Sequence, residues 1–304
     1  MHSSTKDDIK MNDLAIQFLD AIRCAGLMPP EYIEPGKLYR FPGAGKRQGN
    51  TAGWCRLFDD GQGGFFGDWS TGLSTHWRPK LDKPYSCSGR KASLDRASRV
   101  RAQTKADCKA RQAVAANRAA EIWGLGSPAP CDYPYLVRKR IGEHSARLYK
   151  GVLVLPVRDF NNKLTSLQFI DPTGRKRLLK CGLKKACFIP VSRRINAARR
   201  VLICEGWATG CTLAENDPTA LVLAAIDAGN LQPVAIAARN KWPSLELVVA
   251  GDDDRQTSGN PGASKARAAA ISAGALLTIP QWPADAPESL TDFNDLANWL
   301  EERK

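Results

Sequence analysis

The apolar run Val201-Leu202-Ile203-Cys204 leads directly into Glu205-Gly206, and the run Leu247-Val248-Val249-Ala250 leads into Gly251-Asp252-Asp253-Asp254. Continuous apolar runs of this length are typical of buried parallel strands. In an open α/β sheet the ligand site lies beyond the carboxyl ends of the strands, so we expect both acidic clusters to meet at one edge. The two stretches therefore predict a parallel sheet that carries a divalent-cation site.

The rest of the segment after residue 200 alternates apolar runs with helical patterns. We expect strands at 201–204, 220–225, 245–250 and 275–279, and helices near 208–216, 230–240, 262–273 and from about 293. Alternation of this kind is typical of α/β folds. It predicts a mainly parallel four-stranded sheet flanked by helices.

The acidic residues suit a hard metal ion. Asp252 and Asp254 are two apart on an extended segment, so their carboxylates point to the same side. Mg²⁺ is commonly held by one or two carboxylates together with waters and substrate phosphates. Glu205, at another strand end, suits a general acid or base or an additional ligand. One such acidic pair alone is often a solvated cap, whereas the combination favours a metal site.

The charge of the chain is unevenly distributed. The formal net charge is +13 with a pI near 9.4, but residues 201–304 hold 7 Lys or Arg against 14 Asp or Glu, and residues 1–200 hold 37 against 17. Clustered Lys and Arg attract phosphates and release counterions. This pattern indicates a basic part that holds nucleic acid and an acidic part that holds metal.

The bulk composition indicates a folded protein. The 304 residues have room for about two domains, and they are 43% hydrophobic and 25% charged. Nine cysteines include no CxxC pair, so no zinc is expected. Because no signal-peptide core opens the chain and no apolar run reaches the roughly 20 residues that span a bilayer, we expect a cytoplasmic protein with reduced thiols and no membrane partner.

The N-terminal part reads as an α+β region. Apolar residues at helical spacing predict a helix that ends near residue 26, and the Gly- and aromatic-rich residues 39–77 predict a small antiparallel β unit. Trp54, Trp69 and Trp77 could stack on unpaired DNA bases, as aromatic faces do. A small β unit also needs aromatic side chains in its core, so both interpretations stay open.

A long basic helix is predicted over residues 88–123, as a solvated connector or as a DNA-binding surface. A Gly- and Pro-rich linker follows at 124–134, and strands are predicted at 151–157 and 164–170. The expected domains are 1–87, 88–123, 124–197 and 198–304. Candidate phosphate-binding residues gather before the last of these: Arg138, Lys139, Arg140, Arg175, Lys176, Arg177 and Lys180.

Residues 198–304 resemble the TOPRIM domain, which is shared by DnaG-type primases, type IA and type II topoisomerases and some nucleases. Its signature is a Glu-Gly after the first strand, a DxD after a later strand and a third acidic segment. Glu205-Gly206 and Asp252-Asp253-Asp254 match the first two, and Thr291-Asp292-Phe293-Asn294-Asp295 resembles the third.

The resemblance extends beyond this domain. Residues 133–141, 167–171 and 225–231 are similar to stretches of TraC-like plasmid primases and their phage relatives. This resemblance implies a DNA primase that makes short RNA primers on single-stranded DNA from ribonucleoside triphosphates, with Mg²⁺ or Mn²⁺. It also implies a plasmid or phage setting, in replication or conjugation, with a replicative helicase supplied in trans.

The same resemblance assigns roles to the acidic residues. Glu205 would be the acid or base or a metal ligand, Asp252 and Asp254 would bind metal, and Asp292 or Asp295 would complete the site. The zinc module that opens DnaG-type primases has no counterpart in the sequence motifs. Two rival hypotheses remain: a TOPRIM nuclease that uses similar metals, and a non-catalytic nucleic-acid-binding accessory.

Overall fold

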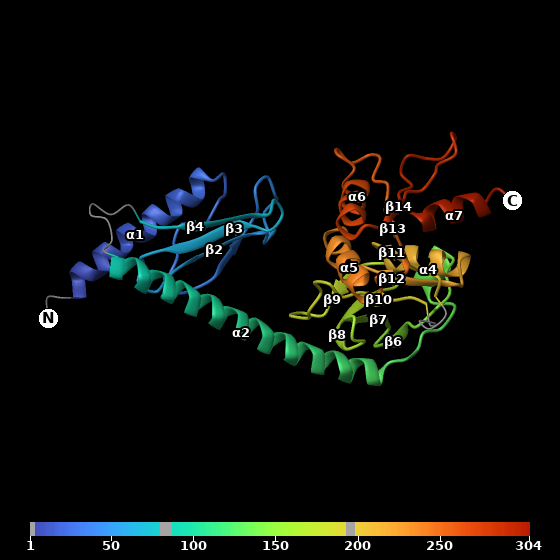
Figure 1. Cartoon of the computed structure of the whole chain (residues 1–304), viewed down its shortest axis with the longest axis horizontal. Helices are drawn as coiled ribbons and strands as arrows, with labels where there is room; N and C mark the ends of the chain where they lie inside the picture. The colour runs from blue at the N-terminus through green and yellow to red at the C-terminus, as the bar shows by residue number, and fades with distance from the viewer. Residues whose placement is uncertain (1–3, 80–86, 193–197) are drawn as a thin grey trace. The chain divides into compact units, whose positions relative to one another are not determined.

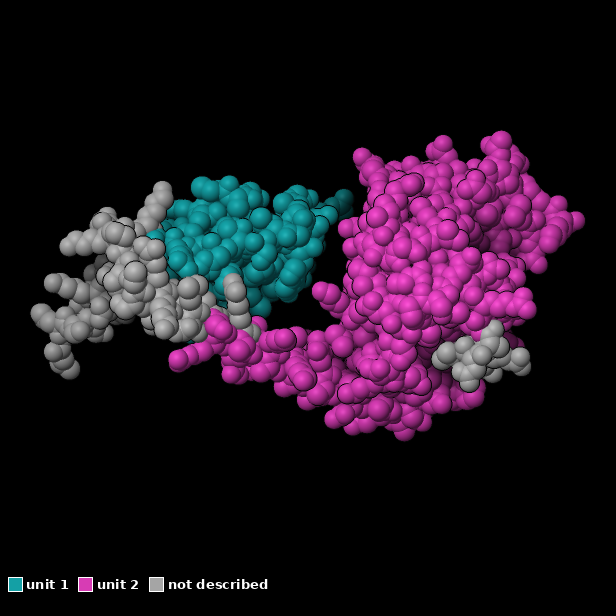
Figure 2. Space-filling view, in the orientation of Figure 1, with its two compact units in different colours: residues 1–95 teal, residues 96–304 magenta. Residues whose placement is uncertain are grey.

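The computed structural model describes residues 4–79, 87–192 and 198–304 (Figure 1). The chain divides into two compact units, Met1–Asp95 and Arg96–Lys304, which Figure 2 shows in different colours. Each unit has a hydrophobic core of its own.

The first unit is a helix packed on one face of an antiparallel sheet. Phe18 and Ile22 of the helix lie in the core with Leu57 and Phe66 of the sheet. The sheet has the order β1-β2-β3-β4. The elements are α1 (Ser4–Cys24), β1 (Tyr39–Phe41), β2 (Gly53–Leu57), β3 (Gly64–Asp68) and β4 (Leu73–Trp77). The small antiparallel β unit predicted from the sequence is present.

The long helix α2 (Cys87–Leu125) is packed against sheet residues towards its end. Ala119 and Ile122 are buried against Val154 and Leu167, whereas residues 102–111 are all exposed. A helix that is polar on every side gains little from burial, so its exposed turns depend on the good helix propensity of Ala, Arg, Lys and Gln.

The second unit contains a five-stranded antiparallel sheet, sheet B, in the order β5-β6-β7-β8-β9. Its strands are β5 (Ser127–Pro128), β6 (Arg147–Tyr149), β7 (Val152–Arg158), β8 (Leu164–Ile170) and β9 (Lys176–Leu178). The two long strands are those predicted from apolar runs. The sequence analysis missed β9 and the helix α3 (Pro134–Lys139) because β9 is short and fully exposed and α3 is barely two turns long.

The third sheet, sheet C, has the order β10-β12-β11-β13-β14. Its strands are β10 (Ile189–Pro190), β11 (Arg200–Cys204), β12 (Ala220–Ala224), β13 (Glu246–Ala250) and β14 (Leu276–Thr278), and its helices are α4 (Trp207–Asn216), α5 (Ala228–Lys241), α6 (Pro261–Ala273) and α7 (Phe293–Glu301). The last four strands pair in parallel, and β10 joins antiparallel to β12. The predicted four-stranded parallel sheet is confirmed, with one short edge strand added.

Alternating side chains of sheet C separate two cores. Val222 and Ala224 face a core shared with α4 and sheet B, whereas Leu221 and Leu223 face a core shared with α5 and α6. Successive strand residues point to opposite faces, so this division follows from the sequence of β12 itself. Sheet C is therefore buried on both faces. Its partly exposed acidic side chains follow the ends of the strands.

Candidate metal centre at the carboxyl edge of the parallel sheet

Glu205 and Asp252 lie at the ends of neighbouring strands. Cys204, the last residue of β11, is paired in register with Ala250, the last residue of β13. Glu205 follows Cys204 directly, and Asp252 follows Ala250 by two residues. The acidic segments therefore leave the sheet at the same level, as expected for neighbouring parallel strands.

Asp252 carries the most perturbed carboxyl group of the site. Burial, followed by the negative charges of Glu205, Asp292 and Asp254, raises the pKa of Asp252 to about 8, and Lys176 opposes that rise. Its Oδ1 atom is buried without a hydrogen-bond partner among the described residues. A buried charge without a partner is unfavourable, so a bound cation would stabilise the ionised form of this carboxylate.

Glu205 lies in the same electrostatic field. Burial raises the pKa of Glu205, and the charges of Asp254 and Asp227 add to the rise. The backbone N–H of Ala228, at the start of α5, donates to the Glu205 carboxylate and lowers its pKa, as does Lys176 to a smaller extent. The first turn of a helix stabilises negative charge, so α5 both orients Glu205 and favours its ionised form.

Asp253 and Asp254 play different parts. Asp254 Oδ2 accepts a 2.9 Å hydrogen bond from the backbone N–H of Gly262, in the first turn of α6. Asp253 accepts 2.6 Å and 2.9 Å hydrogen bonds from the side chains of Asn260 and Trp282. Asp253 is thus turned towards Asn260 and Trp282, as the alternation of side chains along an extended segment predicts.

Asp292 and Asp295 cap the last helix. Asp292 is the N-cap of α7, where its carboxylate accepts a 2.8 Å hydrogen bond from the backbone N–H of Asp295. Asp295 in turn accepts from the backbone N–H of Thr291 and forms a 3.1 Å ion pair with Lys139. Asp292 acts on the charge of Asp252, whereas Asp295 is engaged by Lys139. Of the two candidates, Asp292 is therefore the one that belongs to the carboxylate cluster.

Buried asparagines that the sequence analysis did not single out hold the site in place. Asn294 donates to the Lys139 carbonyl oxygen at 2.7 Å and to Thr212 at 2.9 Å, which ties α7 to α3 and α4. Asn230 donates to the carbonyl oxygens of Ala225 and Cys187 and accepts from the Ala186 N–H. Their positions within the 225–231 and 291–295 segments were the available signal.

The Asp252–Asp254 loop also depends on a close approach to α6. Asn260, the N-cap of α6, accepts from the backbone N–H groups of Asp254 and Ala263. A Cβ atom on Gly262 would stand 2.7 Å from the backbone oxygen of Asp252. Glycine is required there because no side chain fits between the helix and the loop. The Asn-Pro-Gly start of α6 could have indicated this, since Asn caps helices and Pro favours the first helical position.

Among the basic candidates, Lys176 is the one that faces the carboxylates. Its Nζ atom lies 3.9 Å from the place where a Cβ on Gly206 would stand, and it lowers the pKa of both Glu205 and Asp252. Arg177 is paired with Phe169 and therefore points to the opposite face of sheet B. Arg175 and Lys180 are exposed.

The remaining basic candidates are engaged elsewhere. Lys139 is paired with Asp295, and Arg140 forms a 2.9 Å exposed ion pair with Glu302. Arg138 donates to the carbonyl oxygen of Pro172. The structure thus divides the predicted basic set into one residue at the site, three that link neighbouring segments, and three that project from or beside β9.

The residues present fit a divalent cation. Within residues 4–79, 87–192 and 198–304, no three His, Cys, Asp or Glu side chains are close enough to form a complete metal cage. Mg²⁺ is usually bound through one or two carboxylates, with waters and substrate phosphates in its other positions. The unpartnered oxygen of Asp252 and the neighbouring Glu205 and Asp254 are ligands of this kind.

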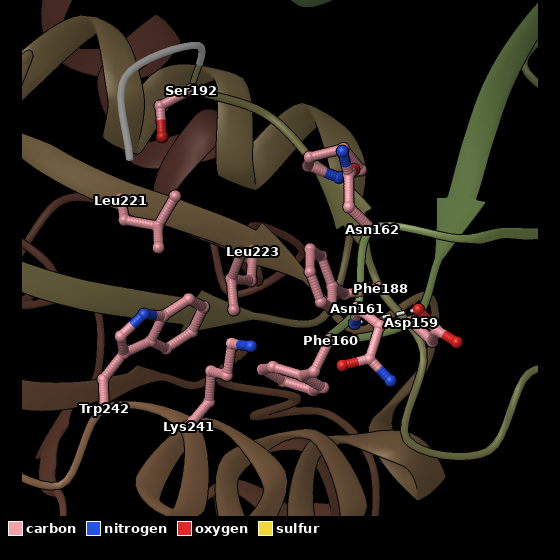
Figure 3. Close-up of a pocket in the computed structure, with 11 residues that line it drawn as sticks. Asp159, Phe160, Asn161, Asn162, Phe188, Ser192, Leu221, Leu223, Lys241 and Trp242 are labelled. Atoms are coloured by element: carbon pink, nitrogen blue, oxygen red, sulfur yellow. Dashed lines mark hydrogen bonds between the residues drawn. The ribbon is translucent and has the colours of Figure 1, made fainter. Parts of the chain in front are cut away.

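A pocket with a different character lies elsewhere in this unit. A pocket of about 410 Å³ is lined by aromatic and aliphatic side chains, chiefly Phe160, Phe188, Trp242 and Leu223 (Figure 3). Trp242 follows the last residue of α5, whereas Glu205 receives its hydrogen bond from the first. A helix of 14 residues is about 21 Å long, so the pocket is separate from the carboxylates.

In the first unit the structure sorts the three tryptophans. Trp54 and Trp69 stack at 5.9 Å, Trp69 is 58% exposed, and the Arg40 guanidinium lies 3.7 Å from the centre of the Trp69 ring. Trp77 instead packs against Phe18 of α1 at 5.1 Å. Trp77 is therefore removed from the candidate stacking residues, because its side of β4 faces the core.

Comparisons with known proteins agree with this arrangement. Residues 200–299 match the family described as the Toprim domain. The chain carries a Toprim domain. Two Escherichia coli proteins named DNA primase TraC are 31% identical to it, over 283 and 307 residues, which are 87% and 91% of this chain. These matches cover only 26% and 20% of the relatives, so the chain spans about a quarter of their length or less.

Solved primase structures are more distant. The crystal structure of the primase fragment of the bacteriophage T7 primase-helicase protein is 14% identical, with a TM-score of 0.43 over 88% of this chain and 96% of that one. The DnaG primase catalytic domain bound to single-stranded DNA is 11% identical, with a TM-score of 0.41 over 64% and 80% of the two chains. No helix of the described residues has both the length and the apolarity needed to cross a membrane.

Proposed function

We propose that this chain is the primer-synthesising core of a DNA primase, with its active site at the carboxyl edge of sheet C. The observation that carries this proposal is the electrostatic cluster of Glu205, Asp252, Asp254 and Asp292, in which a buried oxygen of Asp252 has no hydrogen-bond partner in the described part of the chain. Its place within the Toprim domain and the similarity to TraC over most of the chain support a polymerase rather than a nuclease.

The chemistry needed is attack by a 3′-hydroxyl on the α-phosphate of a ribonucleoside triphosphate, which forms a phosphodiester bond, breaks the bond to the β-phosphate and releases pyrophosphate and the hydroxyl proton. A bound Mg²⁺ or Mn²⁺ supplies neutralisation of charge on the attacking and leaving oxygens. Asp252 and Asp254 would bind the ion. The negative charge of Asp292 would add to the attraction between the site and the cation. Glu205 would act as a further ligand or accept the proton of the 3′-hydroxyl, for which its raised pKa suits it.

Lys176 is the natural partner of the triphosphate. It projects from β9 towards Gly206, beside the first turn of α4. Phosphates bind at helix N-termini next to a cationic side chain, because backbone N–H groups and the helix dipole favour negative charge. In this role Lys176 orients the nucleotide and the carboxylates hold the metal.

The first unit would contribute to template binding. Arg40, Trp54 and Trp69 form a row of stacked cationic and aromatic groups on the sheet face opposite α1. Aromatic faces stack on unpaired bases without a strong sequence preference, and Arg adds attraction to phosphate. The proposed template is single-stranded DNA, in the cytoplasm, in plasmid or phage replication or conjugation, with a replicative helicase supplied in trans.

A single assay tests the proposal. The protein is incubated with Mg²⁺, labelled ribonucleotides and a single-stranded DNA template, and the products are separated by length. Elongated RNA is the expected result; shortened template would support a Toprim nuclease instead. The double variant Glu205→Gln with Asp252→Asn should lose synthesis and keep DNA binding. The matched double variant Asp285→Asn with Glu288→Gln, which changes two exposed acids, should keep both.

A further inference from the structure

Besides Lys176 at the carboxylates, the larger unit has basic residues on the opposite face of sheet B. They line a groove of about 490 Å³ between α2 and the segment that follows β9. We name it the α2 groove. Its lining residues are Ala110, Arg111, Val114, Ala115, Arg118, Leu179, Lys180 and Cys181.

The α2 groove has an apolar floor and a cationic rim. Val114, although 69% exposed, lies in it with Ala115 and Leu179, while Arg111, Arg118 and Lys180 stand around them. None of its lining residues is acidic. Arg118 of the rim forms an exposed ion pair with Glu121, at 2.9 Å. Exposed ion pairs of this kind contribute little to stability. The groove therefore offers net positive charge above an apolar surface.

The strand β9 connects this groove to the proposed active site. Lys176 is paired with Ile170, which faces the Toprim core, whereas Arg177 is paired with Phe169, which faces α2. Lys180 is four residues after Lys176, so their Cα atoms lie within about 14 Å of one another. A flexible anion that runs past the end of β9 can therefore meet both faces.

We propose that the α2 groove binds a stretch of single-stranded nucleic acid next to the active site, with phosphates on Arg111, Arg118 and Lys180 and sugars or bases over Val114 and Leu179. The positive charge of the groove favours a polyanion over an apolar partner. Its apolar floor suits the sugars and bases of a nucleic acid, which free phosphate lacks. The inference rests on the proposed function for the identity of the strand, but it assigns a separate surface. It also gives the exposed turns of α2 a role beyond that of a connector.

The exposed thiol of Cys181 makes the groove testable in the full chain. Alkylation by a small maleimide is followed peptide by peptide by mass spectrometry, with and without a saturating oligodeoxythymidylate. We expect DNA to slow the alkylation of Cys181 at least severalfold relative to the exposed thiols of Cys24 and Cys131, which are outside the groove. Alkylation of Cys181 that is unchanged at saturating DNA would overturn the proposal.

Charge removal gives an independent measurement. The double variant Arg111→Gln with Lys180→Gln should weaken binding on the order of tenfold and reduce the slope of log affinity against log salt by about 1.4, since each phosphate contact to a single strand contributes about 0.7. The matched variant Lys265→Gln with Arg267→Gln, exposed on α6, removes the same charge. Equal losses in both double variants would reduce the effect to overall charge and overturn the groove.

The results separate this inference from the proposed function. If the protein makes primers while Cys181 stays unprotected, the groove is wrong and the primase proposal stands. If Cys181 is protected while no RNA is made, the groove stands and the primase proposal fails. All four substituted side chains are exposed, so changes in folding are not expected, and a thermal melt checks this.

Discussion

The two ends of α5 lie beside opposite kinds of surroundings, one aromatic and one acidic. At its last turn lies the aromatic pocket, where Phe160 contacts Phe188 and Trp242 at 4.8 and 5.6 Å between ring centres (Figure 3). Two polar side chains of that pocket are satisfied: Asp159 accepts from the backbone N–H groups of Asn161 and Lys163, and Ser192 accepts from that of Val222. At its first turn the carboxylates of Glu205 and Asp252 are half-buried, close to other acids, and in part unpartnered.

The two ends of α5 differ in their expected effect on the stability of the folded protein. Ring contacts and satisfied polar groups make the pocket a stabilising feature. Like charges held together in a half-buried site are destabilising unless a ligand neutralises them, and perturbed carboxyls of this kind concentrate at functional sites. The carboxyl edge is therefore the better candidate for chemistry.

The largest expected effect is at Asp252. Replacing it with Asn keeps the shape and removes the charge that would hold a cation, so RNA synthesis should fall on the order of a thousandfold. Initial rates on a single-stranded template measure this. Asp253→Asn is the informative neighbour, because Asp253 is turned towards Asn260 and Trp282; it should lower stability more than it lowers the rate in the folded protein. Equal loss of rate in both folded variants would contradict the division between them.

A smaller loss is expected at Glu205. Glu205→Gln removes a group that can accept a proton, and a general base contributes on the order of a hundredfold or more. If Glu205 is the base, the variant loses the acidic limb of the pH–rate profile, and that limb in the wild type lies above the ordinary pKa of glutamate because burial raises the pKa of Glu205. If Glu205 is only a ligand, higher concentrations of Mn²⁺ should restore much of the rate while the limb remains.

The sequence was informative about this edge because backbone rules determine it. Apolar runs of β11 and β13 predicted parallel strands, and parallel strands bring their carboxyl ends to one edge, so the approach of Glu205 to Asp252 followed from topology. The two-residue spacing likewise separated Asp253 from its neighbours.

Other features of the site could not be read from local patterns. The difference between Asp292 and Asp295 depends on which one meets Lys139, a residue more than a hundred positions earlier. The same holds for Lys176, which reaches the carboxylates because β9 pairs with β8 in a register set by tertiary packing. Seven candidate basic residues were equivalent in the sequence, and folding separated them.

The charge at Asp252 should also be visible in stability. Since its pKa is raised to about 8 in the folded protein from about 3.9 in an unfolded chain, the folded state binds more protons between these values. The free energy of unfolding attributable to this group therefore falls as pH rises from about 4 to about 8. Denaturant titrations with a chelator present should show Asp252→Asn gaining stability over the wild type between about pH 6 and about pH 8. A constant difference would place the Asp252 charge in a solvated environment.

Metal binding should reverse that trend. A cation that binds the Asp252 carboxylate displaces its proton, so Mg²⁺ affinity should rise with pH up to about 8, the pKa of that group. Calorimetry in two buffers of different ionisation enthalpy measures the proton released per ion bound. Asp252→Asn should abolish the release, and release that persists in this variant would assign the titration to another group.

The smallest effect on synthesis is expected at the other end of α5. Phe160→Ala removes a ring that contacts two others, and such truncations cost about 3–5 kcal/mol when the ring is buried; because Phe160 is only half-buried, we expect about half that loss. The rate of RNA synthesis at a temperature where the variant stays folded should change by less than about twofold, since nothing in the pocket acts on the carboxylates. A much larger fall in rate without loss of folded protein would mean that the aromatic pocket is coupled to the active site through α5. In that case a shift of α5 would move Glu205, because the Ala228 N–H at the start of α5 donates to its carboxylate. The two ends of α5 would then not be independent.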